Sequence, residues 1–315
     1  MSTRTIDVDG VALCTETFGA PEDAPVLLIM GIGASMLWWD AAFCAALAAG
    51  GRFVVRYDHR DTGRSSACPP GRPDYGGPDL VADAARVLDG HGIARAHVVG
   101  ASMGGALAQL LALDFPDRVA SLVLMSTSPA GPADDLPGVT DSYAAFLAQA
   151  RLDWSERRSV VEYRIAEVRA LNGQRPFDEE SVRAFVERDA ARAVSAASAQ
   201  NHELLDGGRP WRDRLGEIAV PTLVIHGGAD PLFPPGHAEA LANEIPGARL
   251  LVLDGAGHVL HPGDHDAVVR AILDHTADVQ RYHGAARHVA GRGGRDSGSC
   301  RSSPRTAPRR ARRPR

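Results

Sequence analysis

The sequence predicts an α/β fold, with a mostly parallel central sheet, helices on both faces and a helical cap insertion. Short apolar runs alternate with longer helical patterns, and this alternation favours parallel pairing through crossover helices. The pentapeptide Gly100-Ala101-Ser102-Met103-Gly104 stands between one apolar run and an Ala/Leu-rich segment, as a strand–turn–helix unit would. A charged block without strand-like runs, between about Pro129 and Trp211, predicts the cap.

The individual elements follow from periodicity and turn residues. The run Pro25–Met30 is apolar throughout, which suits a strand buried on both faces. Turn residues such as Asp9-Gly10 separate the runs. The expected strands are 5–8, 12–18, 25–30, 52–57, 96–99, 119–126, 220–226 and 249–254, and the expected helices are 35–49, 79–91, 106–113, 236–244 and 264–275. The predicted domains are core residues 1–128, a cap at 129–213, a second core part at 214–278 and a tail at 279–315.

Composition indicates a globular protein and limits its partners. The chain has 315 residues and is 44% hydrophobic, enough to bury a core. No run approaches the ~18–20 apolar residues of a membrane span, and residues 1–7 show no signal-like apolar region. The four cysteines form no C-x-x-C pair, which favours thiols in a reducing compartment: Cys14, Cys44, Cys68 and Cys300. We therefore expect a cytoplasmic protein that binds no metal, cofactor or membrane.

The C-terminal segment differs in charge from the rest of the chain. All 34 basic residues are arginine, a bias typical of a GC-rich genome, and residues 281–315 contain eleven Arg and one Asp. Such a segment could be a nucleic-acid arm. It also lacks apolar periodicity and is rich in Gly, Ser and Pro, which predicts a disordered extension. We expect no nucleic-acid partner.

The pattern G-x-S-x-G at residues 100–104 predicts a nucleophilic serine. Its turn is so sharp that the serine takes a strained backbone conformation, and glycine at 100 and 104 removes Cβ atoms that would clash. The N-terminus of the following helix favours developing negative charge. A bare match to this pattern arises often by chance, but the flanking strand and helix favour Ser102 as the nucleophile.

A serine nucleophile needs a base, and the base needs an orienting carboxylate. Where the serine stands at the turn between a strand and a helix, the acid and the histidine follow it in the chain. The order is Ser, Asp/Glu, His, and each stands after a later strand. Asp230 follows the expected strand 220–226, and His258 lies in a Gly-rich loop after the strand 249–254. An ordinary turn Asp is the alternative for Asp230. The histidines expected to play no catalytic part are His97, His226, His261 and His265.

The tetrahedral intermediate needs two hydrogen-bond donors for its oxyanion. We expect one from the backbone N–H of Met103, the residue after the nucleophile. The other should come from Ile32, in the loop Gly31-Ile32-Gly33 after the apolar strand. Trp38 and Trp39 follow this loop and are candidates to line a substrate pocket, although packing in the core is an equally open interpretation.

These residues resemble the α/β-hydrolase family over about residues 5–275. The loop Asp58–Ser65 is similar to that family's D-x-R-G-x-G-x-S segment, with Asp61 where glycine is usual. A closer similarity, to the anthracycline methylesterases, rests on these segments: Leu28–Gly31, Arg56–Ser65, Ala96–Gly100 and Val220–Ile225. That group has glycine at the position of Ile32, a change that leaves the backbone donor in place.

The resemblance implies hydrolysis of the methyl ester of a carbomethoxy group on an aromatic polyketide, after which the freed acid can lose carbon dioxide. Ser102, Asp230 and His258 would form the triad, with a small aromatic ester as substrate and no cofactor. A generic carboxylesterase, lactonase or thioesterase stays open, because the triad alone does not exclude it. Dehalogenases and epoxide hydrolases are disfavoured, because those members carry Asp at the elbow. A catalytically silent binding protein of this fold is the alternative from another class.

Overall fold

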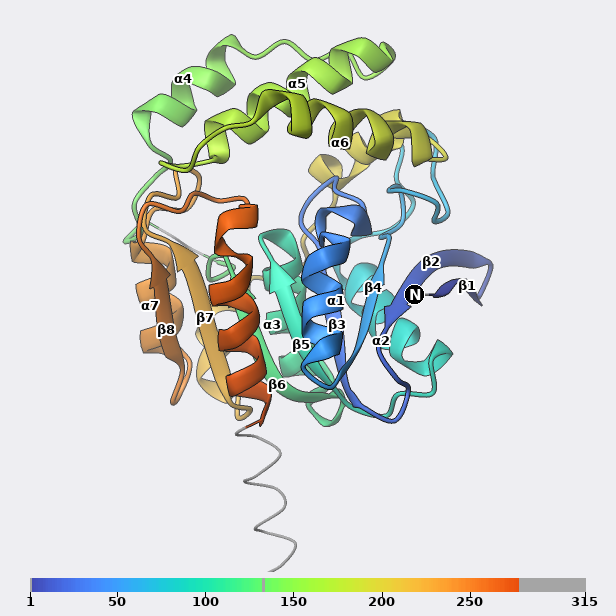
Figure 1. The fold of residues 1–315 in the computed structure, drawn as a ribbon, viewed down its shortest axis with the longest axis vertical. Helices are drawn as coiled ribbons and strands as arrows, with labels where there is room; N and C mark the ends of the chain where they lie inside the picture. The colour runs from blue at the N-terminus through green and yellow to red at the C-terminus, as the bar shows by residue number, and fades with distance from the viewer. Residues whose placement is uncertain (1, 132–133, 278–315) are drawn as a thin grey trace, which may run out of the picture. The chain divides into compact units, whose positions relative to one another are not determined.

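The computed structural model describes residues 2–131 and 134–277, and Figure 1 shows how their elements are arranged. The predicted tail at residues 279–315, with Cys300, lies outside the described residues. Its expected disorder, and the absence of a nucleic-acid role, stay predictions.

The centre of the fold is an eight-stranded sheet in the order β1-β2-β4-β3-β5-β6-β7-β8. The pairs β1/β2 and β2/β4 are antiparallel, and all other neighbours are parallel. The predicted mostly parallel sheet is therefore confirmed. The strands are β1 Ser2–Val8, β2 Val11–Phe18, β3 Ala24–Ile29, β4 Arg52–Tyr57, β5 Ala96–Ala101, β6 Val119–Met125, β7 Thr222–Gly227 and β8 Arg249–Leu253.

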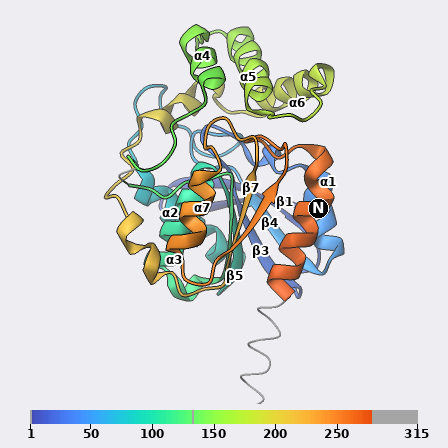
Figure 2. The ribbon, with the colours of Figure 1, turned by 90° about the vertical axis from the view of Figure 1, so that its left-hand side faces the viewer.

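Helices cover both faces of the sheet (Figures 1 and 2). One face carries α1 (Ala41–Ala49) and the helix over residues 265–277. The other carries α2 (Gly77–Gly90), α3 (Met103–Asp114) and α7 (Gly236–Glu244). Each face has its own apolar core, because the central parallel strands are buried on both sides. Among the described helices, none combines the length and apolar character that a bilayer span requires.

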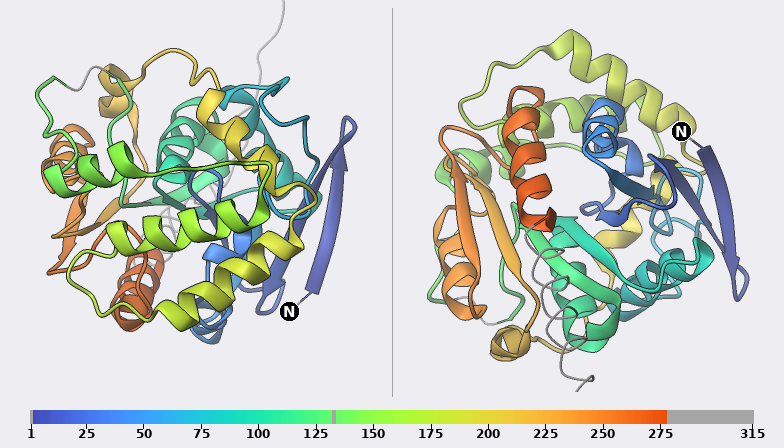
Figure 3. Two further views of the ribbon diagram at one scale, coloured as in Figure 1. Left: turned by 90° about the horizontal axis from the view of Figure 1, so that it is seen from above. Right: turned by 60° about the horizontal axis from the view of Figure 1, so that its bottom comes forward.

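Three helices stand between β6 and β7 in the sequence and lie beyond the carboxyl ends of the parallel strands. They are α4 (Asp141–Gln149), α5 (Arg157–Leu171) and α6 (Glu179–Arg192), and Figure 3 shows them from above. Two 3-10 segments, Ala196–Leu204 and Arg212–Glu217, lead back to β7. The shorter 3-10 turns are Met36–Trp38, Pro116–Arg118 and Pro262–Asp264.

The continuous helix expected over residues 35–49 is wrong. The structure has the single 3-10 turn Met36–Trp38, an extended Trp39, and only then α1. Asp40 begins α1 by accepting a hydrogen bond from the N–H of Ala42 at 2.7 Å. Aspartate competes for backbone N–H groups inside a helix and is favoured at its N-cap, so the chain restarts the helix at this residue.

Candidate active site

Ser102 lies at the turn between β5 and α3 with φ 53° and ψ −122°, outside the regions that L-residues favour. Its N–H donates to the carbonyl of Met125 at 3.0 Å, and Thr127 Oγ1 donates to the Ser102 carbonyl at 2.8 Å. These bonds on both sides of Ser102 hold the strained turn.

The glycines of the turn are required by close backbone contacts. A Cβ on Gly100 would lie 2.2 Å from the carbonyl oxygen of Gly104. A Cβ on Gly104 would lie 2.2 Å from the carbonyl oxygen of Ile29 in β3. Both distances are far below van der Waals contact, so no side chain fits at either position.

Asp230, which follows β7, and His258, which follows β8, lie in contact with each other. His258 Nδ1 lies 2.8 Å from Asp230 Oδ2, while Asp230 Oδ1 accepts from the N–H groups of Leu232 and Phe233, both at 2.9 Å. Asp230 is buried. Burial alone would raise the pKa of this carboxyl group, but its hydrogen bond to and electrostatic interaction with His258 outweigh burial and lower the pKa. The carboxylate is therefore kept ionised and aimed at the imidazole.

The loops that carry these two residues are bound to each other and to a cap helix. The N–H of Ala229 donates to the carbonyl of Ala256 at 2.8 Å, which links the Asp230 and His258 loops. The N–H of His258 donates to the carbonyl of Leu171, the last residue of α5, at 2.8 Å. The position of His258 thus depends on the cap as well as on the sheet.

Ser102 and His258 line the same cavity. No hydrogen bond joins their side chains in the described part of the chain. Catalytic hydrogen bonds often tighten only when substrate is bound, so this geometry leaves His258 available as the base for Ser102.

The loop Gly31-Ile32-Gly33, which is expected to supply an oxyanion donor and is called the oxyanion loop, lies against Ser102. A Cβ built on Gly31 would lie 3.2 Å from Ser102 Cβ and 3.7 Å from its Oγ. The N–H of Gly33 already donates to His202 Nδ1 at 2.9 Å. By contrast, the N–H groups of Ile32 and Met103 have no acceptor among the described residues. Met103 begins α3, so its N–H has no acceptor within the helix, and Ile32 lines the same cavity as Ser102.

The other histidines near the site have backbone partners or core positions. His261 Nε2 lies 3.1 Å from the carbonyl of Pro176, and its Nδ1 accepts from the N–H of Gly263. His226 Nε2 lies 2.7 Å from the carbonyl of Phe233 and 3.6 Å from Asp230 Oδ2, while His97 Nδ1 lies 2.8 Å from Ser121 Oγ. His265 packs its ring edge on Phe43, with ring centroids 5.5 Å apart, and lines the cavity.

The cavity over Ser102 has a volume of about 610 Å³, within the range of small-molecule sites. Trp38 and Trp39 both line it. Trp39 is fully buried and stacks on Phe43, so it serves the core as well, while Trp38 Nε1 donates to Asp189 of α6 at 3.0 Å. Most of the remaining lining is apolar and comes from the sheet edge, the cap and the His258 loop, including Met30, Leu37, Tyr143, Val168, Phe185 and Leu260.

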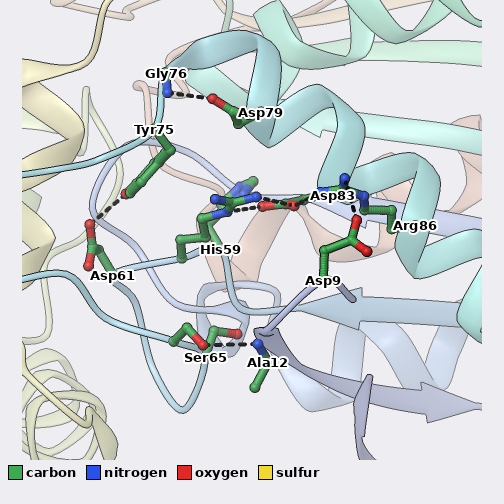
Figure 4. Close-up of polar contacts among 12 residues, drawn as sticks. Asp9, Ala12, His59, Asp61, Ser65, Tyr75, Gly76, Asp79, Asp83 and Arg86 are labelled. Atoms are coloured by element: carbon green, nitrogen blue, oxygen red, sulfur yellow. Dashed lines mark hydrogen bonds and ion pairs between the residues drawn. The ribbon is translucent and has the colours of Figure 1, made fainter. Parts of the chain in front are cut away.

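Asp61, expected above to stand where glycine is usual, has a left-handed backbone, with φ 64°. Its buried carboxylate accepts from Tyr75 Oη at 2.6 Å, the interaction visible in Figure 4, and from Asn201 Nδ2 at 2.9 Å. The strain of a non-glycine residue is thus offset by hydrogen bonds that a glycine could not make. Nearby in Figure 4, Arg86 lies beside Asp83.

Sequence reasoning missed two residues that contact the oxyanion loop, Arg164 of α5 and His202. Arginine in a helix and histidine in an irregular segment carry no local signal, and only the packing of the cap brings them to the loop. Among the described residues, no cluster of three or more His, Cys, Asp or Glu side chains is placed to hold a metal.

The fold and the site together define an α/β hydrolase. The profile of the family described as alpha/beta hydrolase fold matches residues 24–264, and this chain belongs to that family. The expected family resemblance is thereby confirmed.

Two relatives are methylesterases. The chain is 36% identical over 293 residues to rhodomycin D methylesterase DnrP of Streptomyces peucetius, covering 88% of this chain and 98% of the relative. It is 37% identical over 297 residues to rhodomycin D methylesterase DauP of Streptomyces sp. (strain C5), with the same coverage. Among solved structures, a hydrolase from Pseudomonas aeruginosa PA01 is 31% identical with a TM-score of 0.66, covering 87% of this chain and 98% of that one.

Proposed function

We propose that this chain is a serine carboxylic ester hydrolase that removes the methyl ester of a carbomethoxy anthracycline or a related aromatic polyketide in antibiotic biosynthesis. The observation that carries the proposal is one cavity of about 610 Å³ lined by Ser102 and His258, with Asp230 hydrogen-bonded behind the histidine. The relatives named as rhodomycin D methylesterases support the choice of substrate.

In the acylation step, Ser102 Oγ attacks the ester carbonyl while His258 Nε2 takes the hydroxyl proton. Asp230 holds Nδ1–H and stabilises the imidazolium, because its carboxylate stays charged. The N–H groups of Ile32 and Met103 donate hydrogen bonds to the carbonyl oxygen and stabilise the negative charge that develops on it. His258 then gives the proton to the methoxy oxygen, methanol leaves, and the acyl group stays on Ser102.

In the deacylation step, water gives a proton to His258 Nε2 and attacks the acyl carbonyl. The second tetrahedral intermediate uses the same two donors and collapses with return of the proton to Ser102 Oγ. The product is the free acid, which can lose carbon dioxide in a later step. No residue of the described site is assigned to that loss.

The size of the cavity supports this choice of substrate. A methyl ester of a short acid would fill little of a cavity of about 610 Å³, whereas a flat tetracyclic ring system would bury most of its surface there. The binding energy of the rings can then position the ester carbonyl against Ser102.

We further propose that residues 129–213 act as a substrate-binding cap over the core, and that the enzyme works in the cytoplasm with a small-molecule partner only. The described cysteines are free thiols, which fits a reducing compartment: Cys14, Cys44 and Cys68.

The test is turnover of a carbomethoxy anthracycline beside a small methyl ester and p-nitrophenyl esters, followed by mass spectrometry. The tetracyclic ester should exceed the small methyl ester in kcat/KM by at least about 10³-fold, or about 4 kcal/mol of transition-state binding. Equal turnover of the two methyl esters would reduce the proposal to a generic carboxylesterase. Ser102→Ala should abolish turnover of every ester, and an active variant would remove Ser102 from the mechanism.

A further inference from the structure

The oxyanion loop is held from the cap side. Both polar backbone groups of Gly33 are engaged: its N–H donates to His202 Nδ1 at 2.9 Å, and its carbonyl accepts from Arg164 Nη2 at 3.1 Å. Arg164 belongs to α5, and His202 belongs to the 3-10 segment Ala196–Leu204 that follows α6. Two parts of the cap, both far from the loop in sequence, therefore form hydrogen bonds to one glycine of the loop.

His202 is itself fixed in one orientation and one tautomer. Its Nε2 lies 2.8 Å from the carbonyl of Arg60, so Nε2 carries the hydrogen and Nδ1 is left as an acceptor for the N–H of Gly33. The side chain is buried, and burial, together with repulsion from His59, lowers the pKa of His202 to about 4. A neutral imidazole is what the bond to Gly33 requires, because a protonated Nδ1 would be a second donor facing a donor.

Arg164 approaches the loop closely at Gly33. A Cβ on Gly33 would lie 2.6 Å from Arg164 Nη2. Gly33 also has φ +60°, a conformation that L side chains rarely adopt. Glycine allows this geometry and, in a free loop, many others. The two hydrogen bonds select one.

The orientation of Gly33 bears on the oxyanion donor next to it. The N–H of Gly33 and the carbonyl of Ile32 form one planar peptide group, so the bond to His202 sets the direction of that plane. The plane in turn limits the rotation of the chain at Ile32, whose own N–H belongs to the preceding peptide. A donor must point at the developing oxyanion to stabilise it, and small displacements lose much of the effect.

We propose that His202 and Arg164 are positioning residues, which fix the peptide groups around Gly33 and thereby aim the Ile32 N–H at the oxyanion. This inference rests on the proposed function, because it takes Ile32 as an oxyanion donor. His202 acts through the loop alone, whereas Arg164 also lines the cavity and pairs with Glu167 at 2.7 Å.

The same cap helix also holds the other half of the site. Arg164 contacts the oxyanion loop, and the carbonyl of Leu171, about two helical turns further along α5, accepts the N–H of His258 at 2.8 Å. A shift of α5 would therefore displace the oxyanion donor and the base together.

Two isosteric variants separate the two hydrogen bonds of His202. His202→Asn places an amide oxygen near the position of Nδ1, which keeps the acceptor for Gly33 N–H and loses the bond to Arg60. His202→Gln reaches toward the position of Nε2, which keeps the bond to Arg60 and loses the acceptor. We expect His202→Gln to lower kcat by about 10–100-fold, a fraction of the ~10²–10³-fold that loss of a whole oxyanion donor costs. His202→Asn should stay within about 3-fold of wild type. Arg164→Met also removes the ion pair with Glu167, 2.7 Å away in the cavity wall, so its loss of kcat should be at least that of His202→Gln.

Asn201→Ala is the matched control. Asn201 is the buried neighbour of His202, and its three hydrogen bonds go to Gly71, Asp61 and Pro69, none of them in the oxyanion loop. It should lower the melting temperature as much as the His202 variants do, while kcat measured well below that temperature stays near the wild-type value. Melting curves of all variants identify any that fail to fold.

The deciding readout is binding of a trifluoromethyl ketone, whose adduct with Ser102 carries an oxyanion, compared with binding of the product acid. In His202→Gln the affinity for the ketone should fall by the same factor as kcat/KM does, while the affinity for the product acid stays unchanged. If His202→Gln and His202→Asn both match wild type in an active enzyme, the inference is wrong and the proposed function stands. If His202→Gln, His202→Asn and Arg164→Met each lose activity in proportion to their fall in melting temperature, the role of His202 is only structural. If the wild type hydrolyses no ester, the proposed function fails first, and the inference falls with it.

Discussion

At Ser102 the backbone takes a left-handed conformation, and at Asp230 a carboxylate is buried and kept ionised. Both features cost stability in isolation, and both are held in place by neighbouring hydrogen bonds. Thr127 and Met125 form hydrogen bonds with the backbone of Ser102. His258 and two backbone N–H groups form hydrogen bonds with the carboxylate of Asp230. Costly local states of this kind are typical of sites that must be organised before substrate arrives.

The first prediction concerns the acid. Asp230→Asn removes the charge and presents an amide N–H or oxygen to His258 Nδ1, so the imidazole loses its preferred tautomer and its counter-ion. We expect kcat to fall by about 10⁴-fold with little change in fold. Steady-state kinetics beside circular dichroism check this result. Activity within tenfold of wild type would mean that Asp230 is an ordinary turn residue.

The second prediction separates two neighbouring histidines. His258→Ala should be as inactive as Ser102→Ala, because residues that act as a unit are not additive. His261→Ala should stay active, since both ring nitrogens of His261 serve backbone groups. A fluorophosphonate probe should label Ser102 in His261→Ala and fail to label it in His258→Ala. The reverse pattern would transfer the role of base to His261.

At the scale of elements, the site is assembled where strands end and where the cap helices return to the sheet. The elbow requires β3, β5 and α3 to approach within a distance that only glycine permits. Helix α5 contacts both the oxyanion loop and the His258 loop. Ser102 is thus held by the core, whereas the oxyanion loop and His258 are held by the core and by α5 together.

The third prediction tests the packing at the elbow. Gly104→Ala would place a Cβ 2.2 Å from the carbonyl oxygen of Ile29, and backbone cannot yield as a side chain can. We expect a loss of stability of about 1–3 kcal/mol together with loss of turnover, as strand and helix move apart. Gly216→Ala is the control, because nothing lies within 4 Å of its Cβ position, and it should change stability by no more than about 0.5 kcal/mol. Urea unfolding of both variants measures the difference. Equal stabilities would show that the elbow has room to relax.

At the scale of the whole molecule, two buried histidines near the oxyanion loop tie global stability to pH. Burial lowers the pKa of His59 to about 4, and His202 has a similar value. Both folded-state values lie below the ordinary value of 6.5, so between about pH 6.5 and 4 the unfolded chain binds more protons than the folded one. Stability from these groups is present above that window and is lost as the pH falls through it.

The fourth prediction follows from this sign. His59→Gln keeps a donor near the position of Nε2, which lies 3.0 Å from the carbonyl of Met30, and removes the titration. The pH slope of the unfolding free energy between pH 6.5 and 5 should become shallower by up to about 1.4 kcal/mol per pH unit. Urea unfolding across that range measures the slope. An unchanged slope would mean that His59 binds its proton equally in both states.

Much of this protein can be predicted from its sequence, because the decisive signals are local. Apolar runs bounded by turn residues mark buried strands, and the alternation with helices implies the parallel sheet. Ser102, Asp230 and His258 each follow such a run within four residues. Since the carboxyl ends of parallel strands share one edge of the sheet, the order of these residues in the chain already indicates that they meet.

Only the tertiary structure decided how the cap engages this edge. The bond from Trp38 to Asp189 and the hydrogen bonds of Arg164 and His202 to Gly33 depend on contacts between distant segments. Periodicity reports which face of a helix is buried, but it does not report what that face meets. A buried polar side chain finds its partner only when the segments dock, so the support of the oxyanion loop is a property of the packed cap.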